Sequence, residues 1–195
     1  MPSLILIRHS NSALDPRRPA PEWGLTAEGR QRCQQLAEQL KPYAPDVLIA
    51  SQERKAWQTT QEIATWLEIP WFTFPGLQEH MRLKAPYFPD PQSFRAAVEK
   101  LFQHPQELVF GEETAAQALA RFSGAIDMAL AQFADRSVGI ITHGTVLSLF
   151  VANRCQLNAW QLWQSLELPA FVVLDIPGFK LRKVVSRLPG EETRA

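Results

Sequence analysis

Leu4-Ile5-Leu6-Ile7-Arg8-His9 is a run of four apolar residues that ends in two polar ones. This order predicts a buried strand over Leu4–Ile7 that stops at a site. His9 offers a ring nitrogen that can attack at neutral pH, and Arg8 offers a planar guanidinium that matches phosphate oxygens. The same residues are also consistent with a strand that merely ends in two solvated side chains. The rest of the sequence must decide between the two interpretations.

Further strand-like and helix-like segments alternate along the chain. Apolar runs predict strands over 47–50, 71–74, 138–141 and 171–175, with a last edge strand over 180–185. Helices are expected after Thr26, after Ser51 as a capping residue, from the Thr114–Gln117 capping box onward, and over 144–151. This alternation predicts an α/β fold, a three-layer α/β/α sandwich around a mostly parallel sheet.

The alternating pattern weakens between residues 80 and 110. Prolines flank a short helical stretch there that carries Phe94, Val98 and Leu101, which predicts a small insertion over the active-site edge of the sheet. We expect a single domain over residues 1–188, with the insertion at about 80–110, and a disordered tail at 189–195. Several aromatic residues either line an apolar mouth or belong to the core; they are Phe72, Phe74, Tyr87, Phe88 and Phe94.

The composition excludes several classes of partner. The 195 residues include 20 basic and 20 acidic side chains, so no overall field attracts nucleic acid or an anionic membrane. A charged ligand must therefore be bound by a local cluster. Cys33 and Cys155 are the only cysteines, and neither belongs to a CxxC pair, which argues against a disulfide framework or structural zinc. With no signal peptide and no apolar run long enough to cross a bilayer, we expect a cytoplasmic protein.

Polar clusters follow three of the expected strands at their carboxyl ends: Arg8-His9, Ser51–Lys55 and Thr142-His143-Gly144. In a parallel sheet these ends meet at one edge, where the ligands of α/β proteins bind. Gly144 lets a helix begin close to a bound group, and helix N-termini attract anions. Two histidines at two strand ends, with basic residues nearby, predict an anion site at this edge.

Together with Leu25-Thr26-Ala27-Glu28-Gly29 and Leu77-Gln78-Glu79, these clusters resemble the histidine phosphatase superfamily, in its phosphoglycerate mutase-like branch. The matching segments occur in the family's order between residue 4 and about residue 150. The resemblance implies an α/β/α fold and a phosphohistidine intermediate, with neither a cofactor nor a metal ion.

The resemblance also implies roles for individual residues. His9 corresponds to the nucleophile, Arg8 to a phosphate clamp, and His143 to the second pocket histidine, with Gly144 beside it at the phosphate. Glu79 corresponds to the proton donor, which protonates the leaving oxygen and then activates water. Such a donor works best with a raised pKa, as in a closed pocket.

The helix-start pattern of the family, Ser-x-x-x-Arg-Ala-x-x-Thr, is matched except at its arginine, where this chain has Lys55. Lysine keeps the charge but not the bidentate fork. Alignment favours Lys55 as the phosphate-binding replacement. Arg54 is the alternative, because helical spacing places the two side chains on opposite flanks of the buried stripe and does not choose between them.

Other departures and neighbours carry weaker signals. Ser10 replaces the usual glycine, and Asp15 stands where mutase relatives have a phosphate-contacting asparagine, so that an acid there would repel phosphate. Gly111–Thr114 resembles a family segment near the pocket, although helix capping is its expected role. His80 and His104 have no ligand spacing and are expected to be ordinary loop residues.

These features predict a metal-independent phosphatase that acts on a phosphorylated small molecule or a phosphoprotein, with His9 as the nucleophile. Two alternatives stay open: a non-catalytic protein that binds a phospho-ligand, and a phosphotransferase of the phosphoglycerate mutase type. The segment after Glu79 lacks the mutase signature Glu-Arg-His-Tyr-Gly, which favours the phosphatase. The sequence leaves the oligomeric state open.

Overall fold

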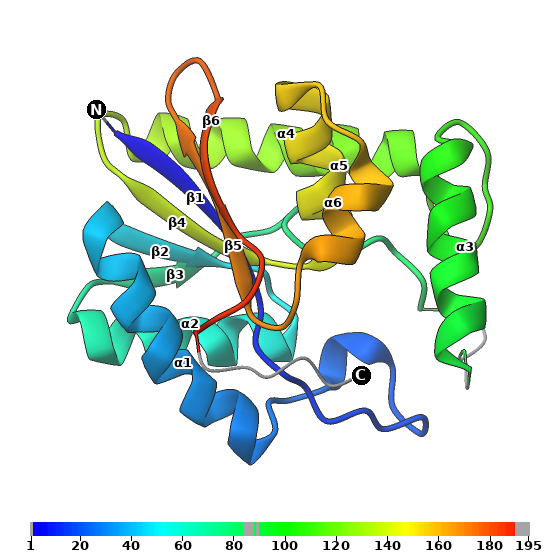
Figure 1. Cartoon of the computed structure of the whole chain (residues 1–195), viewed down its shortest axis with the longest axis horizontal. Helices are drawn as coiled ribbons and strands as arrows, with labels where there is room; N and C mark the ends of the chain where they lie inside the picture. Colours follow the sequence, from blue (N-terminus) through cyan, green and yellow to red (C-terminus); the bar gives the residue numbers. More distant parts are fainter. Residues whose placement is uncertain (1, 84–87, 89, 190–195) are drawn as a thin grey trace.

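The centre of the fold is a six-stranded sheet, seen in a computed structural model that describes residues 2–83, 88 and 90–189 (Figure 1). The strand order is β3-β2-β4-β1-β5-β6. The strands are β1 (Ser3–Arg8), β2 (Val47–Ala50), β3 (Trp71–Thr73), β4 (Val138–Thr142), β5 (Ala170–Asp175) and β6 (Lys180–Val185). The first four run parallel, whereas β5 and β6 pair antiparallel with their neighbours. The predicted mostly parallel sheet is confirmed.

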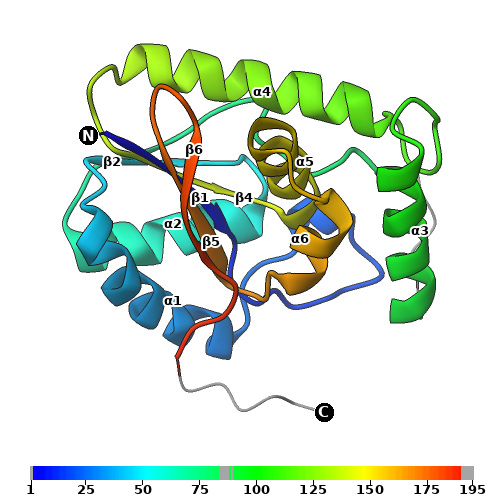
Figure 2. The ribbon, with the colours of Figure 1, turned by 45° about the horizontal axis from the view of Figure 1, so that its top comes forward.

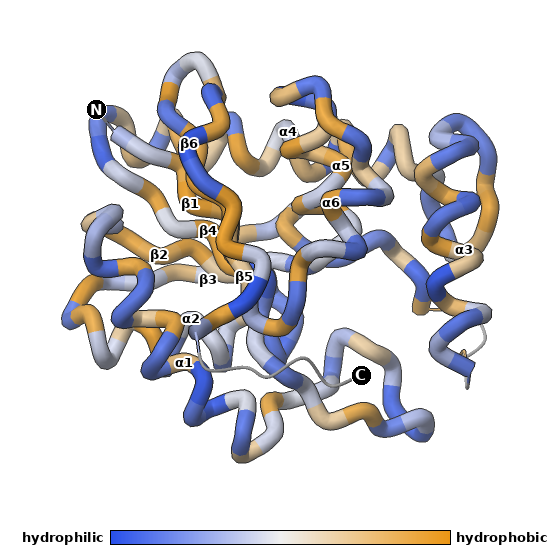
Figure 3. The backbone as a smooth tube through the Cα atoms, in the orientation of Figure 1, coloured by the Kyte–Doolittle hydropathy of each residue, from blue (hydrophilic) through white to orange (hydrophobic). Residues whose placement is uncertain are grey.

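Helices cover both faces of this sheet. α1 (Ala27–Leu40) and α2 (Arg54–Leu67) pack on one face, and α4 (Ala115–Gln132) and α5 (Gly144–Cys155) pack on the other (Figures 1 and 2). Ile5 and Ile7 belong to the core under α1 and α2, while Leu4 and Leu6 belong to the core under α4 and α5. Successive side chains of a strand point to opposite faces, so a strand covered on both sides must be apolar throughout. Figure 3 shows apolar residues gathered along these central strands.

The insertion forms α3 (Pro91–Gln103), which stands beyond the end of α4 and contacts α6 (Ala159–Ser165) (Figure 2). α6 was not expected from the sequence, because seven residues are too few to display a clear helical period. Two short 3-10 turns, η1 (Ala20–Glu22) and η2 (Lys41–Tyr43), complete the described elements. The expected tail at 189–195 falls outside the described residues after Pro189, and so does Tyr87.

The Leu25–Gly29 segment holds the loop that follows β1. Thr26 caps α1 as predicted, since its hydroxyl accepts the Gly29 N–H at 2.9 Å. A Cβ atom at residue 29 would lie 2.2 Å from the Asn11 carbonyl oxygen, so only glycine allows this approach. The Ser10 hydroxyl then donates to the Gly29 carbonyl at 2.8 Å. This packing fixes the backbone directly after His9.

Candidate active site

The carboxyl ends of β1 and β4 bring the two histidines together. Arg8 pairs with Thr142 in the parallel register, so His9 and His143 leave adjacent strands side by side. Their rings meet edge to face with centroids 5.2 Å apart, and both side chains are buried. Ser51 follows β2 on the other side of β4, where its N–H donates to the Ile141 carbonyl at 2.9 Å. The three polar clusters therefore converge at one edge of the sheet.

The His9 ring has a defined tautomer. Its Nδ1 lies 2.7 Å from the Ser10 carbonyl oxygen, and because a carbonyl only accepts, Nδ1 must carry the hydrogen. Nε2 is then left with a free lone pair. Burial lowers the pKa of His9 well below its usual range, and the neighbouring His143 and Lys55 lower it further. His9 is therefore neutral and nucleophilic around pH 7.

His143 is held by its neighbour on β2. The Ser51 hydroxyl lies 2.8 Å from Nε2 and accepts the Glu53 N–H at 3.3 Å, and we assign its own hydrogen to Nε2, which places the ring hydrogen on Nδ1. Nδ1 of His143 is buried and has no hydrogen-bond partner among the described residues. Burial and the charge of Lys55 lower the pKa of His143 well below its usual range. The ring thus offers one unpaired N–H donor to a bound anion.

The two buried neutral histidines should make the folded protein sensitive to acid. In the unfolded chain both rings take up protons below about pH 6.5, whereas in the folded protein they resist protonation. The unfolded state then binds more protons, so the free energy of unfolding should fall with decreasing pH, by up to about 1.4 kcal/mol per pH unit for each histidine. Urea titrations between pH 7 and 5 measure this slope. A His143→Gln variant should show a shallower slope over the same range, and an unchanged slope would contradict the assignment.

Arg8 reaches the site from the last position of β1. Its Nη1 donates to the Leu166 carbonyl, its guanidinium lies 5.9 Å from the Trp163 ring centre, and its Nε is buried without a partner among the described residues. Burial lowers the pKa of Arg8 to about 10, partly opposed by Glu79, so the side chain stays charged at neutral pH. A Cβ at Gly144 would lie 3.1 Å from both the Arg8 guanidinium carbon and the Trp163 ring nitrogen. Glycine there gives the guanidinium its room.

The structure places Lys55, rather than Arg54, in the cavity that His9 and His143 line. The Lys55 ammonium contacts a Glu53 carboxylate oxygen at 2.5 Å and the Ala20 carbonyl at 2.9 Å. Arg54 instead packs beside Gly24, with its Nε 3.4 Å from where a Cβ of that glycine would lie. Of the two alternatives that helical spacing left open, the lysine is the one beside the histidines.

Glu53 is a site residue that sequence reasoning missed. Besides Lys55, its carboxylate accepts the Glu79 N–H at 2.8 Å and lies 3.6 Å from His143 Nε2. The side chain is buried. A buried carboxylate needs a cation, and the only sequence signal was an acid two residues before the lysine.

The prediction that Ser51 caps α2 is wrong. The helix begins at Arg54 with Glu53 in the N-cap position, and Glu53 makes no side-chain cap hydrogen bond. Residues 51–53 form a turn in which the Ser51 hydroxyl accepts the Glu53 N–H and faces His143. The serine serves the histidine because this turn, and not the first helical turn, follows β2.

Glu79 lies against the N-terminus of α5. One carboxylate oxygen accepts the Thr145 N–H at 3.1 Å, and the other accepts the Val146 N–H at 3.3 Å and the His80 N–H at 2.9 Å. Burial raises the pKa of Glu79, but His143, Arg82 and the backbone donors outweigh burial, so the net pKa lies below its usual value. The raised pKa expected for a proton donor is therefore not found at Glu79.

The loop that carries Glu79 is held by a buried ion pair. Arg121 of α4 contacts Glu113 at 2.5 Å and donates to the carbonyls of Gly76 at 2.9 Å and Gln78 at 3.0 Å. Glu113, from the Gly111–Thr114 segment, also accepts the Met81 N–H at 2.9 Å. Thr114 forms the predicted capping box with Gln117. The Gly111–Thr114 segment therefore both caps α4 and, through Glu113, holds the loop that carries Glu79.

The two remaining histidines differ from each other. His80 was expected to be an ordinary loop residue, but it is buried against Phe110, with its Nε2 2.7 Å from the Glu113 carbonyl. His104 is exposed and contacts Glu107 at 3.3 Å, as expected of a loop residue.

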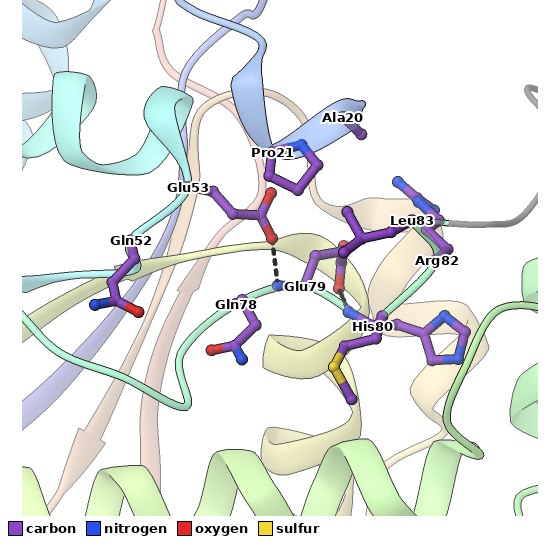
Figure 4. A pocket seen from close by; sticks show the side chains of 10 residues that line it. Ala20, Pro21, Gln52, Glu53, Gln78, Glu79, His80, Arg82 and Leu83 are labelled. Carbon is purple, nitrogen blue, oxygen red and sulfur yellow. Dashed lines mark hydrogen bonds between the residues drawn. The ribbon is translucent and has the colours of Figure 1, made fainter. Parts of the chain in front are cut away.

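Two neighbouring cavities share Glu79 in their walls. The larger, about 550 Å³, is lined by His9, His143, Arg8 and Lys55 among others. The smaller, about 260 Å³, has Glu53, Gln52 and Gln78 in its wall (Figure 4). Arg82 lines both cavities, with its Nη1 buried and without a hydrogen-bond partner among the described residues. Arg82 is thus a further cation at the site, one to which the sequence assigned no role there.

The expected mouth residues divide between the cavity and the rest of the molecule. Phe88 and Phe94 line the larger cavity, whereas Phe72 stacks on Phe133 and Phe74 packs against the core. Asp15 contacts Arg17 at 2.9 Å and is not among the lining residues. The repulsion expected between an acid at this position and phosphate is relieved, because an arginine neutralises the carboxylate.

Comparison with protein families gives one match. A model of the histidine phosphatase superfamily (branch 1) matches residues 4–183. Search of the curated proteins found no match. None of the helices in the described ranges has the length and hydropathy needed to span a bilayer.

Solved structures share the fold at low sequence identity. An alpha-ribazole phosphatase from Shigella flexneri is 21% identical with a TM-score of 0.71, covering 97% of this chain and 99% of that one. A phosphoserine phosphatase variant from Entamoeba histolytica, in complex with phosphoserine, is 17% identical with a TM-score of 0.72, covering 95% and 98%. A mycobacterial glucosyl-3-phosphoglycerate phosphatase with inorganic phosphate is 16% identical with a TM-score of 0.74, covering 96% and 98%.

Proposed function

The chain belongs to the histidine phosphatase superfamily (branch 1), and from this premise we propose that it hydrolyses phosphomonoesters through a phosphohistidine formed on His9. The observation that carries the proposal is the state of the His9 ring. Its Nδ1 donates to the Ser10 carbonyl at 2.7 Å, so Nε2 carries a lone pair beside a cluster of cations. A neutral, oriented imidazole next to phosphate-binding groups is what in-line attack on phosphorus requires.

In the first step, His9 Nε2 attacks the phosphorus atom and the bond to the ester oxygen breaks. Arg8 and Lys55 supply positive charge, and the unpaired Nδ1 of His143 supplies a hydrogen bond to the transferring oxygens. Gly144 lines the same cavity at the start of α5. The Glu79 carboxylate takes the proton that the substrate monoanion carries on a phosphoryl oxygen and passes it to the leaving ester oxygen, so that the alcohol departs neutral and Glu79 is again ionised. Side-chain cations here do the work that metal ions do in other phosphatases.

In the second step, water attacks the phosphohistidine and the N–P bond breaks. Glu79 takes the proton from that water. His9 leaves as a neutral ring whose Nδ1–H still donates a hydrogen bond to the Ser10 carbonyl. The low pKa of Glu79 favours this step, because the carboxylate must be ionised in order to accept the proton. Inorganic phosphate is the product.

The experiment that tests this proposal is capture of the intermediate. Brief mixing with p-nitrophenyl [32P]phosphate, followed by an alkaline quench, should leave a label on His9 that survives alkali and is lost in acid. Turnover should continue in EDTA, because the charge at the site comes from side chains. A protein that binds inorganic phosphate but neither takes up label nor releases nitrophenol would instead be a phospho-ligand binding protein.

The phosphotransferase alternative requires cations for a second phosphate group. The exposed Arg17 and Arg18 at the cavity rim contact Asp15 at 2.9 Å and 3.8 Å, and Arg18 also contacts Glu22 at 3.9 Å, so two carboxylates already balance their charge. The phosphatase names of the relatives point the same way, toward water as the acceptor.

The pH dependence of kcat/KM follows from the low pKa of Glu79. Because this carboxyl is ionised in the free protein, Glu79 must first take up the proton that it passes to the leaving alkoxide, and the substrate monoanion, whose second pKa is about 6, brings that proton into the site. For an alkyl phosphomonoester, kcat/KM should therefore fall by about tenfold per pH unit above about pH 6. The low pKa of His9 keeps the nucleophile unprotonated just below neutrality, so the gain toward pH 6 is retained. Initial rates between pH 5 and 8 measure the profile, and a kcat/KM that rises toward pH 8 would contradict this account.

A further inference from the structure

The larger cavity extends beyond the side chains that we propose bind the phosphate, into an apolar chamber. We name this chamber by six of its lining side chains: Leu14, Trp23, Leu83, Phe88, Phe94 and Trp163. They come from the loop after β1, from the segment before α3, from α3 itself and from α6. Because one continuous cavity holds both the chamber and His9, a phosphoryl group at His9 would direct the rest of its molecule into the chamber.

The inner wall of the chamber is formed in advance by packed rings. Phe94 lies edge to face with Trp163 at 6.1 Å between centroids, and Trp163 stacks on Trp160 at 5.3 Å. The Arg8 guanidinium lies over Trp163, and the Arg82 guanidinium lies 4.6 Å from the Phe94 ring centre. The aromatic wall therefore begins directly at the guanidiniums that face the phosphate.

The mouth of the chamber carries apolar side chains that are exposed to water. Leu14 and Leu83 are each 63% exposed although both line the cavity. Exposed apolar groups that rim a cavity gain free energy when a ligand covers them. The chamber thus offers apolar contact both at its aromatic inner wall and at its mouth.

The charges in the chamber match one phosphate group and no second anion. Lys55 is paired with Glu53, and the rim arginines Arg17 and Arg18 are balanced by Asp15 and Glu22. Arg8 and Arg82 are the cations that keep a buried nitrogen without a hydrogen-bond partner among the described residues lining this cavity, and both lie at the phosphate end.

From this arrangement we infer that the substrate is the monophosphate ester of an uncharged alcohol that carries a ring, with the ring seated against Phe94 and Trp163. The inference rests on the proposed hydrolysis at His9 and adds the class of leaving group. A flat ring can stack on or meet the edges of these aromatic side chains, whereas a carboxylate or a second phosphate there would have to share Arg8 and Arg82 with the phosphoryl group.

The test compares three esters whose leaving groups are all alkoxides: 2-phenylethyl phosphate, ethyl phosphate and phosphoserine. We expect kcat/KM for the phenylethyl ester to exceed that for ethyl phosphate by about 30-fold, since burial of a phenyl ring contributes that much to binding. Phosphoserine should be no better than ethyl phosphate. Phosphate release at fixed pH gives all three values.

Substitution of the wall should remove this preference. Phe94→Ala should reduce the phenylethyl-to-ethyl ratio to about 3 or less, while Phe94→Leu, which keeps an apolar side chain, should retain part of it. The ratio is measured within one protein, so a general loss of folded enzyme cancels. Phe72→Ala is the matched control: this phenylalanine is 52% exposed on β3, outside the cavity, and its loss should leave the ratio unchanged.

The outcomes distinguish failure of the inferred leaving group from failure of the proposed hydrolysis at His9. Equal kcat/KM for the three esters, or a preference for phosphoserine, would overturn the inference and leave hydrolysis at His9 intact. A ratio that survives Phe94→Ala would also overturn it. Failure of every ester to react, together with no label on His9, would overturn the proposed function itself.

Discussion

Replacing His9 with alanine should lower the turnover of every phosphomonoester by at least about 10³-fold. The covalent route is lost with the ring, and direct attack by water on the ester would lack the oriented neutral imidazole that serves as the nucleophile. Release of p-nitrophenol and of inorganic phosphate, each followed at high enzyme concentration, measures the residual rate. The acid-labile label should disappear at the same time.

The His9→Ala protein should still bind inorganic phosphate, because Arg8, Lys55 and His143 remain in the cavity. Calorimetric titration with phosphate, or the fluorescence of Trp163 beside Arg8, reports that binding. His104→Ala is the matched control, since this exposed histidine contacts Glu107 at 3.3 Å, does not line the cavity and should retain full activity. Retention of more than a few per cent of turnover in His9→Ala would exclude the phosphohistidine mechanism.

Replacing Glu79 with glutamine should divide the reaction into its two steps. An alkyl ester needs a proton on its leaving oxygen, so its turnover should fall by about 10²- to 10⁴-fold. p-Nitrophenolate leaves without a proton, so the first step should proceed with this substrate while water attack on the phosphohistidine slows. Rapid mixing should then show a burst of about one equivalent of nitrophenolate, followed by a slow steady state.

The side-chain amide in the Glu79→Gln variant keeps one oxygen that accepts backbone hydrogen bonds, while its NH2 group replaces the other acceptor, so the substitution removes the charge, the exchangeable proton and one acceptor. Glu62→Gln is a suitable control, because Glu62 forms an ion pair with Arg30 at 2.6 Å on the surface of α2, away from the cavity. Equal losses for alkyl and nitrophenyl esters, without a burst, would mean that Glu79 has neither role.

The fold could be predicted from the sequence because its strands are apolar on both faces, and so could the meeting of His9 with His143. The register of β1 against β4 places these histidines side by side wherever the two strands are adjacent. Lys55, which alignment favoured over Arg54, lies in the same cavity. These predictions rest on local patterns and on one rule of topology, which hold before any side chain is placed.

What could not be predicted depends on contacts between distant segments. The turn at residues 51–53 brings Ser51 against His143 and Glu53 against Lys55. The same residues are also typical of a serine that caps a helix, so the sequence does not distinguish the turn from the cap. The pKa of Glu79 is lowered in part by Arg82 and by amides of α5. The sequence around Glu79 does not show that these groups lie beside its carboxyl. The division of the phenylalanines between cavity and core likewise depends on where α3 lies.

The Lys55–Glu53 pair has a consequence for how this site can change by mutation. Both side chains are buried and 2.5 Å apart, so the loss of either alone leaves an uncompensated charge in the protein interior, at a cost of about 3–5 kcal/mol. An arginine introduced at position 55 to match the family pattern would still meet the carboxylate before it met a phosphate. The two positions are therefore epistatic, and a lineage or an engineer must exchange them together.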